Sequence, residues 1–350
     1  MSENVKIFIQ DQTLRSIHTQ LQARNAHLSE LVHAYANDTW AKVQANVKAG
    51  KARALYRIGD EFVCNYTLGN TVYECPWVVV QNDYECEWAD GTKHPGMILQ
   101  MKYATIEEIQ FDKDEVNEVD LNTEPTAIEG WTYFGVTGTA KTKLSLETGD
   151  TIPTTYDRVL KCWIPDVGVV NYGYNRWSHS AYRQWLNSDA TAGNWWEIQH
   201  PGDCAPTQLE SRAGFMAGLD ADFLACVNPV KVQTACNTVT DGGATDITYD
   251  RFFLPSLEEI YAVPQIAGVE GDYWPYWKSI TGLSEPSNAA NDARKIPRLN
   301  NKTGAAVNLR LRSAHRGNSY NVWYVHTGGS LYYSHVAYNS YSSCPACVIS

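Results

Sequence analysis

The C-terminal part of the chain contains a long segment built from very few residue types. Residues 315–343 read HRGNSYNVWYVHTGGSLYYSHVAYNSYSS, with six Tyr, six Ser, three Asn and three His in 29 positions. No Asp, Glu or Lys follows Lys302, whereas an ordinary soluble surface mixes charges of both signs. Tyr gives rigid amphipathic contact area and Ser, Gly and Asn give adaptable hydrogen bonds, as in antibody binding loops. The segment predicts a binding surface.

The same segment fits a β-hairpin. NVWYVHT (321–327) and SLYYSHVAY (330–338) flank Gly328-Gly329, a dipeptide suited to a tight turn between strands. A hairpin whose Tyr and Ser side chains merely face solvent is the alternative interpretation. We expect the interleaved apolar residues to face the core or the framework: Val322, Trp323, Val325, Leu331, Val336 and Ala337.

Charge and composition narrow the classes of partner. The net charge is −11, with −14 on residues 1–302 and +3 on residues 303–350, where Arg310, Arg312 and Arg316 are the only charged residues. No basic cluster could neutralise a run of phosphates, so we expect no nucleic-acid partner. No apolar stretch is long enough for a transmembrane helix, and the start lacks the pattern of a secretory signal. Nine dispersed cysteines favour synthesis in a reducing cytoplasm.

The N-terminal region predicts a helix over residues 12–48. Its apolar residues follow a 3-4 spacing with one missed position near Arg24, which fits either a short coiled-coil seam or an amphipathic helix packed on its own domain. The seam interpretation predicts a homo-oligomer, with a trimer favoured. We expect the helix to end near Ala49-Gly50. The seam residues are Leu14, Ile17, Leu21, Leu28, Leu31 and Tyr35.

The rest of the chain predicts an α+β protein in two parts. Residues 51–125 alternate β-forming residues with turn dipeptides and end in an acidic stretch, typical of a small β-rich module and a linker. Residues 126–350 form one mixed domain that contains the variable tail, about 315–343. WTYFGVTGT (131–139) and VLKCWIPDVGVV (159–170) predict strands. SAYRQWLNS (180–188) and SLEEIYAV (256–263) predict short helices, the second with Ser256 as its N-cap.

The residue mix of the tail also has a genetic regularity. Asn, Ser, Tyr and His codons all differ from AAC by at most one change at an adenine. An enzyme that randomises adenines in an Asn-rich template would leave this mix. In this respect the tail resembles the variable region of the target proteins of diversity-generating retroelements, which are found in phages and bacteria and carry that region at the C-terminus of a C-type-lectin fold.

Three upstream motifs extend the resemblance over residues 170–350. The second is RFFLPSLEEIY (251–261), and the third runs from NLRLRSAHRGN, with Arg312-Ser313 as its core, to Pro345-Ala346. The sequence departs from the family pattern at Leu309-Arg310, where an aromatic residue is common, and at Cys344, where Arg is usual. The first motif is carried by Trp177, Ser178, Arg183, Trp185, Leu186 and Asn187.

The resemblance implies a C-type-lectin-like (formylglycine-generating-enzyme-like) domain preceded by an N-terminal helix and the β-rich module. In that family the exposed side chains of the variable strands bind the ligand. Carried over to this chain, the ligand-binding residues are His315, Ser319, Tyr320, Asn321, Tyr324, His326, Tyr332, Tyr333, Ser334, His335, Tyr338, Asn339, Tyr341 and Ser342.

The expected function is receptor binding or adhesion at the tail tip or fibre of a phage virion. Its partners would be a host-cell surface protein or glycan and other tail or baseplate proteins. A variable protein displayed on a bacterial cell surface is the alternative. We expect no enzyme activity, no cofactor, no metal and no membrane insertion.

Cys344-Pro-Ala-Cys347 is the best candidate for catalysis. A C-x-x-C pair can be redox-active or half of a zinc site, but no second ligand pair completes a zinc site in this sequence. Some lectin-fold oxidases, such as formylglycine-generating enzymes, use a C-terminal cysteine pair. A lectin-fold copper or thiol oxidase that uses Cys344 and Cys347 therefore remains an alternative to structural thiols.

Overall fold

The largest sheet joins strands from both ends of the chain. The computed structural model describes residues 16–24, 38–113, 131–134, 162–165, 173–199, 203–281, 288–335 and 339–350. Five antiparallel strands form this sheet in the order β1-β2-β3-β14-β9. Their bounds are β1 (Glu61–Leu68), β2 (Thr71–Glu87), β3 (Lys93–Met101), β14 (Ala346–Ile349) and β9 (Phe252–Phe253).

This sheet combines the expected β-rich module with the C-terminal strand. β14 pairs with β3 on one side and with β9 on the other, and all four of its residues are buried. β1 alternates buried and exposed residues, so one of its faces packs on the core while the other meets solvent. Strands from residues 51–125 and 126–350 thus share one sheet. The boundary expected at residue 125 lies outside the described residues.

The N-terminal helix is not continuous. Residues 16–24 are helical, and α2 (Trp40–Lys48) begins anew after Thr39, whose extended backbone interrupts any helix and whose side chain caps the amide of Lys42. The prediction of one helix over 12–48 is therefore wrong at Asp38–Thr39. The predicted end is confirmed, because Ala49 is the C-cap and Gly50 adopts a positive φ of 69°.

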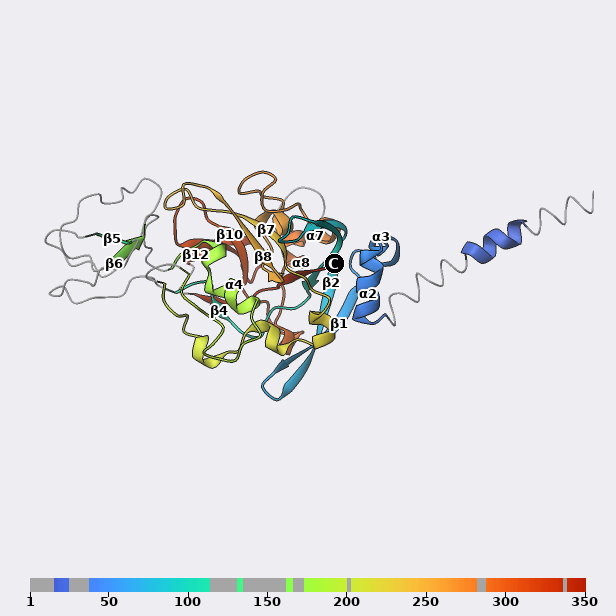
Figure 1. Cartoon of the computed structure of the whole chain (residues 1–350), viewed down its shortest axis with the longest axis horizontal. Helices are drawn as coiled ribbons and strands as arrows, with labels where there is room; N and C mark the ends of the chain where they lie inside the picture. Colours follow the sequence, from blue (N-terminus) through green and yellow to red (C-terminus); the bar gives the residue numbers. More distant parts are fainter. Residues whose placement is uncertain are drawn as a thin grey trace, which may run out of the picture.

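α2 belongs to the main core rather than to a separate arm. Its Val43 and Val47 are fully buried, and the Trp40 ring lies 4.5 Å from that of Phe223. Gln44 donates to the backbone oxygen of Ser350 at 2.8 Å, and Figure 1 places the end of the chain beside α2 and β2. Of the expected seam, the described Ile17 and Leu21 are 47% and 52% exposed. Leu14, Leu28, Leu31 and Tyr35 lie outside the described residues.

An aromatic core fills the space between the five-stranded sheet and short helices. The rings of Trp77 and Phe252 lie 5.8 Å apart, Phe252 and Phe215 lie 5.4 Å apart, and Phe215 lies 5.4 Å from Trp185. Offset and edge-on contacts at such distances stabilise a core beyond simple area burial. Among the described residues, Trp77, Trp177 and Trp185 are fully buried and therefore structural.

The two helices predicted for the C-terminal part are confirmed. α4 (Ala181–Leu186) is capped by Ser180, and α6 (Leu257–Tyr261) begins with a capping box between Ser256 and Glu259. The predicted strands at 131–139 and 159–170 are confirmed where the structure describes them, as the antiparallel pair β5 (Trp131–Phe134) and β6 (Cys162–Pro165). The remaining helices are short: α3 (Ala52–Leu55), α5 (Ala221–Leu224), α7 (Pro275–Thr281) and α8 (Asn288–Ala293).

Smaller antiparallel sheets complete the fold, which confirms the α+β class. A three-stranded sheet contains the predicted hairpin, in the order β10-β11-β12. It consists of β10 (Leu309–Ala314), β11 (Asn321–Val325) and β12 (Leu331–His335), as labelled in part in Figure 1. Two pairs remain: β7 (Val230–Ala235) with β8 (Thr245–Asp250), and β4 (Ile109–Gln110) with β13 (Ser340–Tyr341).

In the part of the chain described here, no helix is both long and apolar enough to cross a membrane.

Candidate functional site

The predicted hairpin forms with the turn at Gly328-Gly329. β11 and β12 pair antiparallel, with Trp323 opposite Tyr333 and Tyr324 opposite Tyr332. Gly329 has a φ of 77°, which glycine adopts without strain. Its carbonyl accepts a hydrogen bond from the Tyr261 hydroxyl at 2.7 Å. Because directly opposite residues share a face of the sheet, the register sorts the aromatic side chains into two clusters.

The first cluster contains His315, Trp323 and Tyr333. The Trp323 and Tyr333 rings meet edge-on at 5.2 Å and 81°. His315 lies 4.3 Å from Tyr333 and 5.5 Å from Trp323. Edge-on aromatic contact fixes ring orientations, so this face of the hairpin presents an ordered set of rings.

The second cluster lies on the opposite face and contains Tyr324, His326, Tyr332 and Tyr341. Tyr324 lies 5.0 Å from Tyr341 and 6.3 Å from Tyr332, and His326 lies 5.3 Å from Tyr332. The guanidinium of Arg310 is 4.4 Å from the centre of the Tyr341 ring, a cation–π contact. We call the two clusters together the aromatic hairpin surface.

Tyr332 and Tyr333 are the accessible members of this surface. They are 54% and 50% exposed, among the most exposed large hydrophobic residues of the described chain. Both belong to β12, which has one neighbour, β11, in its sheet as described. An edge strand with two consecutive exposed tyrosines presents one ring to each face of the sheet. It can therefore contact a partner from either side.

Five of the expected binding residues are buried instead. Ser319, Tyr320, Asn321, Tyr324 and Ser342 are at most 8% exposed, so their side chains cannot contact a ligand in this conformation. For residues 319–321 the turn before β11 folds inward: the Asn318 side chain accepts from the amides of Tyr320 and Asn321, and the distant Asn175 side chain donates to the carbonyls of Asn318 and Asn321. Ser342 lies beneath β10, where its carbonyl accepts from the Arg310 amide at 2.9 Å.

The other expected residues have mixed positions. His315, His326, Asn339 and Tyr341 are half-buried at the margin of the aromatic hairpin surface. Ser334 and His335 lie on β12, opposite Val322 and Asn321, but their side chains, together with Tyr338, Val336 and Ala337, lie outside the described residues.

Trp323 packs on the core and also contacts an exposed tyrosine. Val322 and Val325 are buried as expected. They point to opposite faces of the strand, so both faces of β11 are covered. Trp323 is half-buried and packs against the core, as expected, and its ring meets that of Tyr333. Trp323 therefore joins the core to the aromatic hairpin surface.

The loop that leads into β11 accepts hydrogen bonds from the buried side chain of Asn175. The side-chain amide of Asn175 donates to the carbonyls of Asn318 and Asn321 at 2.8 and 2.9 Å and to that of His315 at 3.2 Å. Its oxygen accepts from Asn237 at 2.9 Å, and both asparagines are fully buried. A buried network with satisfied members specifies one arrangement. This support was not predictable from the sequence, because the contacts span 140 to 146 residues.

A second buried network ties β10 to α6. Arg312 donates to both carboxylate oxygens of Glu259 at 2.6 and 3.0 Å, and the Ser313 hydroxyl donates to Glu270 at 2.7 Å. All four residues are at least 95% buried. Burial raises the pKa of Glu270 to about 7, although Arg312 and the Ser313 hydrogen bond oppose the shift. The core of the third sequence motif is thus a structural anchor.

The first sequence motif lies partly in the interior, with Trp177, Trp185 and Leu186 buried. The Trp177 indole donates to Asp250 at 3.0 Å, and Arg183 pairs with the same carboxylate at 2.7 Å. The Asn187 side chain donates to the Phe252 carbonyl and accepts from the Phe252 amide. These contacts join α4 and the 3-10 turn before it to β8 and to β9, the edge strand of the five-stranded sheet.

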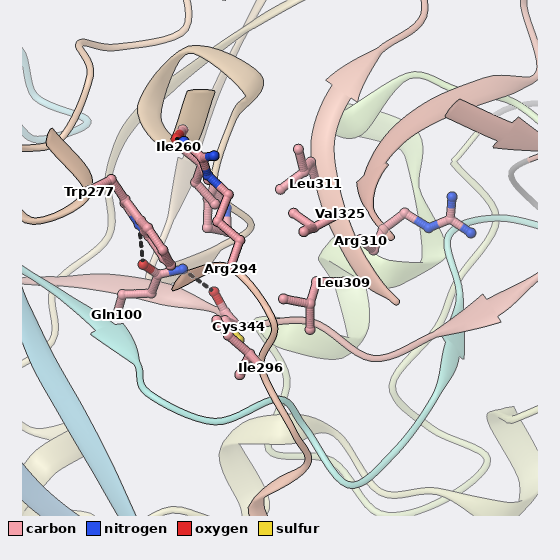
Figure 2. Close-up of a pocket in the computed structure, with 11 residues that line it drawn as sticks. Gln100, Ile260, Trp277, Arg294, Ile296, Leu309, Arg310, Leu311, Val325 and Cys344 are labelled. Atoms are coloured by element: carbon pink, nitrogen blue, oxygen red, sulfur yellow. Dashed lines mark hydrogen bonds between the residues drawn. The ribbon is translucent and has the colours of Figure 1, made fainter. Parts of the chain in front are cut away.

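The cysteine pair lies inside the core. Cys344 and Cys347 are free thiols, 2% and 0% exposed, and burial raises the pKa of each well above its ordinary value. Figure 2 shows Gln100 between Trp277 and the carbonyl of Cys344, beside a cavity of about 10 Å³. That space holds about one water molecule. Buried protonated thiols are poor nucleophiles, so this environment favours the structural interpretation.

Among the described residues, no group of three or more His, Cys, Asp or Glu side chains is placed to hold a metal ion.

Comparison with known proteins identifies a family but names no ligand. A family model described as "Domain of unknown function (DUF6273)" matches residues 164–350, which is more than half of the chain. No curated protein and no solved structure matches the chain significantly.

Proposed function

The chain belongs to the DUF6273 family, and from that premise we propose that this member is a receptor-binding protein whose contact site is the aromatic hairpin surface. Tyr332 and Tyr333 are its central contacts, and His315, Trp323, His326 and Tyr341 surround them. The site takes a protein or glycan on a bacterial cell surface.

One observation carries this proposal: two adjacent, half-exposed tyrosines on an edge strand whose neighbouring strand, β11, is largely buried. Tyr and Trp dominate the binding energy of protein interfaces, because a large apolar ring and a polar tip share one rigid side chain. The rings beside Tyr333 and Tyr332 hold them in place. Little side-chain freedom is therefore lost when a ligand binds, which favours affinity.

The scaffold we propose for this site is a C-type-lectin-like domain of the kind found in variable proteins of diversity-generating retroelements. The support is that its three sequence motifs supply anchors in or at the core: the buried Trp177 and the partly buried Arg183 on Asp250, the buried Arg312 on Glu259, and the buried Ala346 in β14. A scaffold anchored in this way tolerates changes at the exposed tip. Sequencing the genomic neighbourhood tests the diversification, which requires a reverse transcriptase and an Asn-rich near-repeat of residues 315–343.

We further propose that the protein works as a homotrimer at a phage tail tip. The exposed Ile17 and Leu21 on the N-terminal helix support an apolar seam between copies. Three linked sites would raise the apparent affinity of weak single contacts. Light scattering on the full chain should give a trimer, and the Ile17→Glu/Leu21→Glu variant should give a monomer. A monomeric full chain contradicts this part of the proposal.

The test of binding uses fluorescently labelled full chain on a panel of cultured bacterial strains. We expect saturable binding to a subset of strains, and loss of that binding in the Tyr332→Ser/Tyr333→Ser variant. Tyr249→Ser is the matched control, because Tyr249 is 37% exposed on β8, outside the aromatic hairpin surface. Equal binding by the double variant and the control would overturn the proposal. Purified virions probed with an antibody to the chain distinguish a tail component from a cell-surface protein.

A further inference from the structure

Strand β12 carries hydrogen-bonding groups along its free edge, in addition to the tyrosine rings on its two faces. Opposite residues of an antiparallel pair alternate between hydrogen-bonded and non-hydrogen-bonded positions. The amide of His326 donates to the carbonyl of Ser330 at 2.8 Å. Counted from that pair, Tyr332 occupies a hydrogen-bonded position, and Leu331 and Tyr333 occupy non-hydrogen-bonded ones. The backbone N–H and C=O groups of Leu331 and Tyr333 therefore point away from β11.

These outward groups have no hydrogen-bond partner in the described part of the chain. β11 is the only described strand that pairs with β12, and no hydrogen bond joins the outward groups of Leu331 and Tyr333 to another described residue. Tyr333 is 50% exposed, so solvent reaches this edge. A row of unpaired N–H and C=O groups is a template on which another strand can pair.

The edge of the five-stranded sheet provides a contrast. β1 lies at that edge, but the Asp220 side chain accepts from the Asn65 amide at 2.8 Å, and Tyr66 forms an antiparallel bridge with Leu219. Proteins also protect edge strands with Lys, Pro or a β-bulge. β12 reads LYYSH, without Lys or Pro, and pairs with β11 without a break in register. The edge of β12 is thus open among the described residues, whereas that of β1 is partly covered.

The repeat of the outward groups indicates the kind of partner. A donor and an acceptor recur at every second residue, about 6.6 Å apart along the strand. An extended polypeptide has the same repeat of donors and acceptors, whereas sugar rings present hydroxyl groups without this alternation. A strand added here would place its side chains alternately on the face of Tyr332 and on the face of Tyr333. Aromatic residues pair favourably with aromatic and β-branched residues across strands.

We propose that β12 binds an extended segment of a host-cell surface protein, which adds to the three-stranded sheet as a further strand beside Leu331 and Tyr333. This inference rests on the proposed receptor-binding function and narrows its ligand from a protein or glycan to a protein. The main chain of the segment supplies affinity, and the tyrosine rings on the two faces select its side chains.

A matched pair of substitutions at Leu331 isolates the backbone contribution and keeps both contact tyrosines. Leu331→Val retains the outward N–H in a strand-forming residue, whereas Leu331→Pro removes it. Proline is tolerated at the first residue of a strand and at an edge that faces solvent. Labelled Leu331→Pro should bind a recognised bacterial strain at least about tenfold more weakly than Leu331→Val, because it loses one hydrogen bond and its ring obstructs the added strand. Equal binding by the two variants overturns the proposal.

Two measurements on the unmodified chain do not depend on how Leu331→Pro folds. Hydrogen exchange in the free chain should be fast at the amides of Leu331 and Tyr333 and slow at that of Tyr332, which donates to β11. Slow exchange at all three would mean that the edge is already covered, and the proposal would be wrong. Protease treatment of the recognised cells should abolish binding, and periodate, which cleaves the vicinal diols of sugars, should not. The reverse result would assign the site to a glycan and overturn the proposal.

The outcomes separate this inference from the proposed function. If the unmodified chain binds no strain, or if Tyr332→Ser/Tyr333→Ser binds as well as the unmodified chain, the proposed function fails and this inference fails with it. If binding needs the tyrosines but Leu331→Pro and Leu331→Val bind equally, strand addition alone fails. Light scattering covers a further occupant: a lower molar mass for Leu331→Pro than for Leu331→Val would show that a second copy of the chain pairs with β12, which also contradicts the proposal.

Discussion

Strands β11 and β12 have similar residues and opposite surroundings. Tyr324 on β11 and Tyr332 on β12 are directly opposed, yet Tyr324 is 8% exposed and Tyr332 is 54% exposed. β11 has a neighbour on each side, β10 and β12, while β12 lies at the edge of the sheet. Location within the sheet, more than residue type, determines which tyrosine can meet a ligand.

The two strands also differ in the contacts that hold them to the rest of the fold. The loop before β11 is held by Asn175 and continues into a strand whose neighbour, β10, carries the buried Arg312 and Ser313. The exposed rings of β12 contact other rings at its surface. We therefore expect substitutions in the first region to change folding stability and substitutions in the second to change binding.

The largest expected effect is at Arg312. Arg312→Met leaves the Glu259 carboxylate buried without its cation, and it should lower the free energy of unfolding by about 3–5 kcal/mol. Urea unfolding measures this change. Arg53→Met breaks an exposed ion pair with Asp83 and should leave the unfolding midpoint almost unchanged. If the two variants lost similar free energies of unfolding, the expectation that the buried network below β11 determines folding stability would be contradicted.

The Tyr324–Tyr332 pair gives the sharpest contrast within one face. Tyr324→Ser removes a buried ring that contacts Tyr341 and should cost about 2–4 kcal/mol of folding stability. Tyr332→Ser removes an exposed ring and should change stability by no more than about 0.5 kcal/mol. Thermal unfolding of both variants under one condition decides the point. Equal stability losses would mean that β12 is covered in solution.

Glu270 predicts a dependence of stability on pH. Its pKa is about 7 in the folded chain, against an ordinary value near 4.5, so the folded state holds the proton over that range. Stability should therefore fall as pH rises from about 4.5 to about 7, by on the order of 1–3 kcal/mol. Glu270→Gln mimics the protonated side chain, so the variant should lack that fall and be the more stable chain at pH 8. A parallel fall in both chains would contradict the assignment to Glu270.

The sequence predicted those features that depend on local pattern. The hairpin follows from the two strand-like runs around Gly328-Gly329, the cap of α6 follows from Ser256 and Glu259, and the end of α2 follows from Gly50. Each of these requires only short-range hydrogen bonds and backbone preferences.

Features that depend on distant contacts were not predictable. The burial of Ser319, Tyr320 and Asn321 depends on Asn175, far upstream, and a Tyr/Ser/Asn composition does not distinguish a buried turn from an exposed one. The break before α2 depends on Thr39 as a cap, a signal that the helical spacing obscured.

The central claim is that the exposed tyrosines of β12 bind the ligand without supporting the fold. The most direct measurement compares the unmodified chain with Tyr332→Ser/Tyr333→Ser, by thermal unfolding and by binding to a bacterial strain that the unmodified chain recognises. The account predicts a stability change within about 0.5 kcal/mol for each substitution and a loss of binding free energy of about 2 kcal/mol or more. Unchanged binding together with a large loss of stability would contradict it.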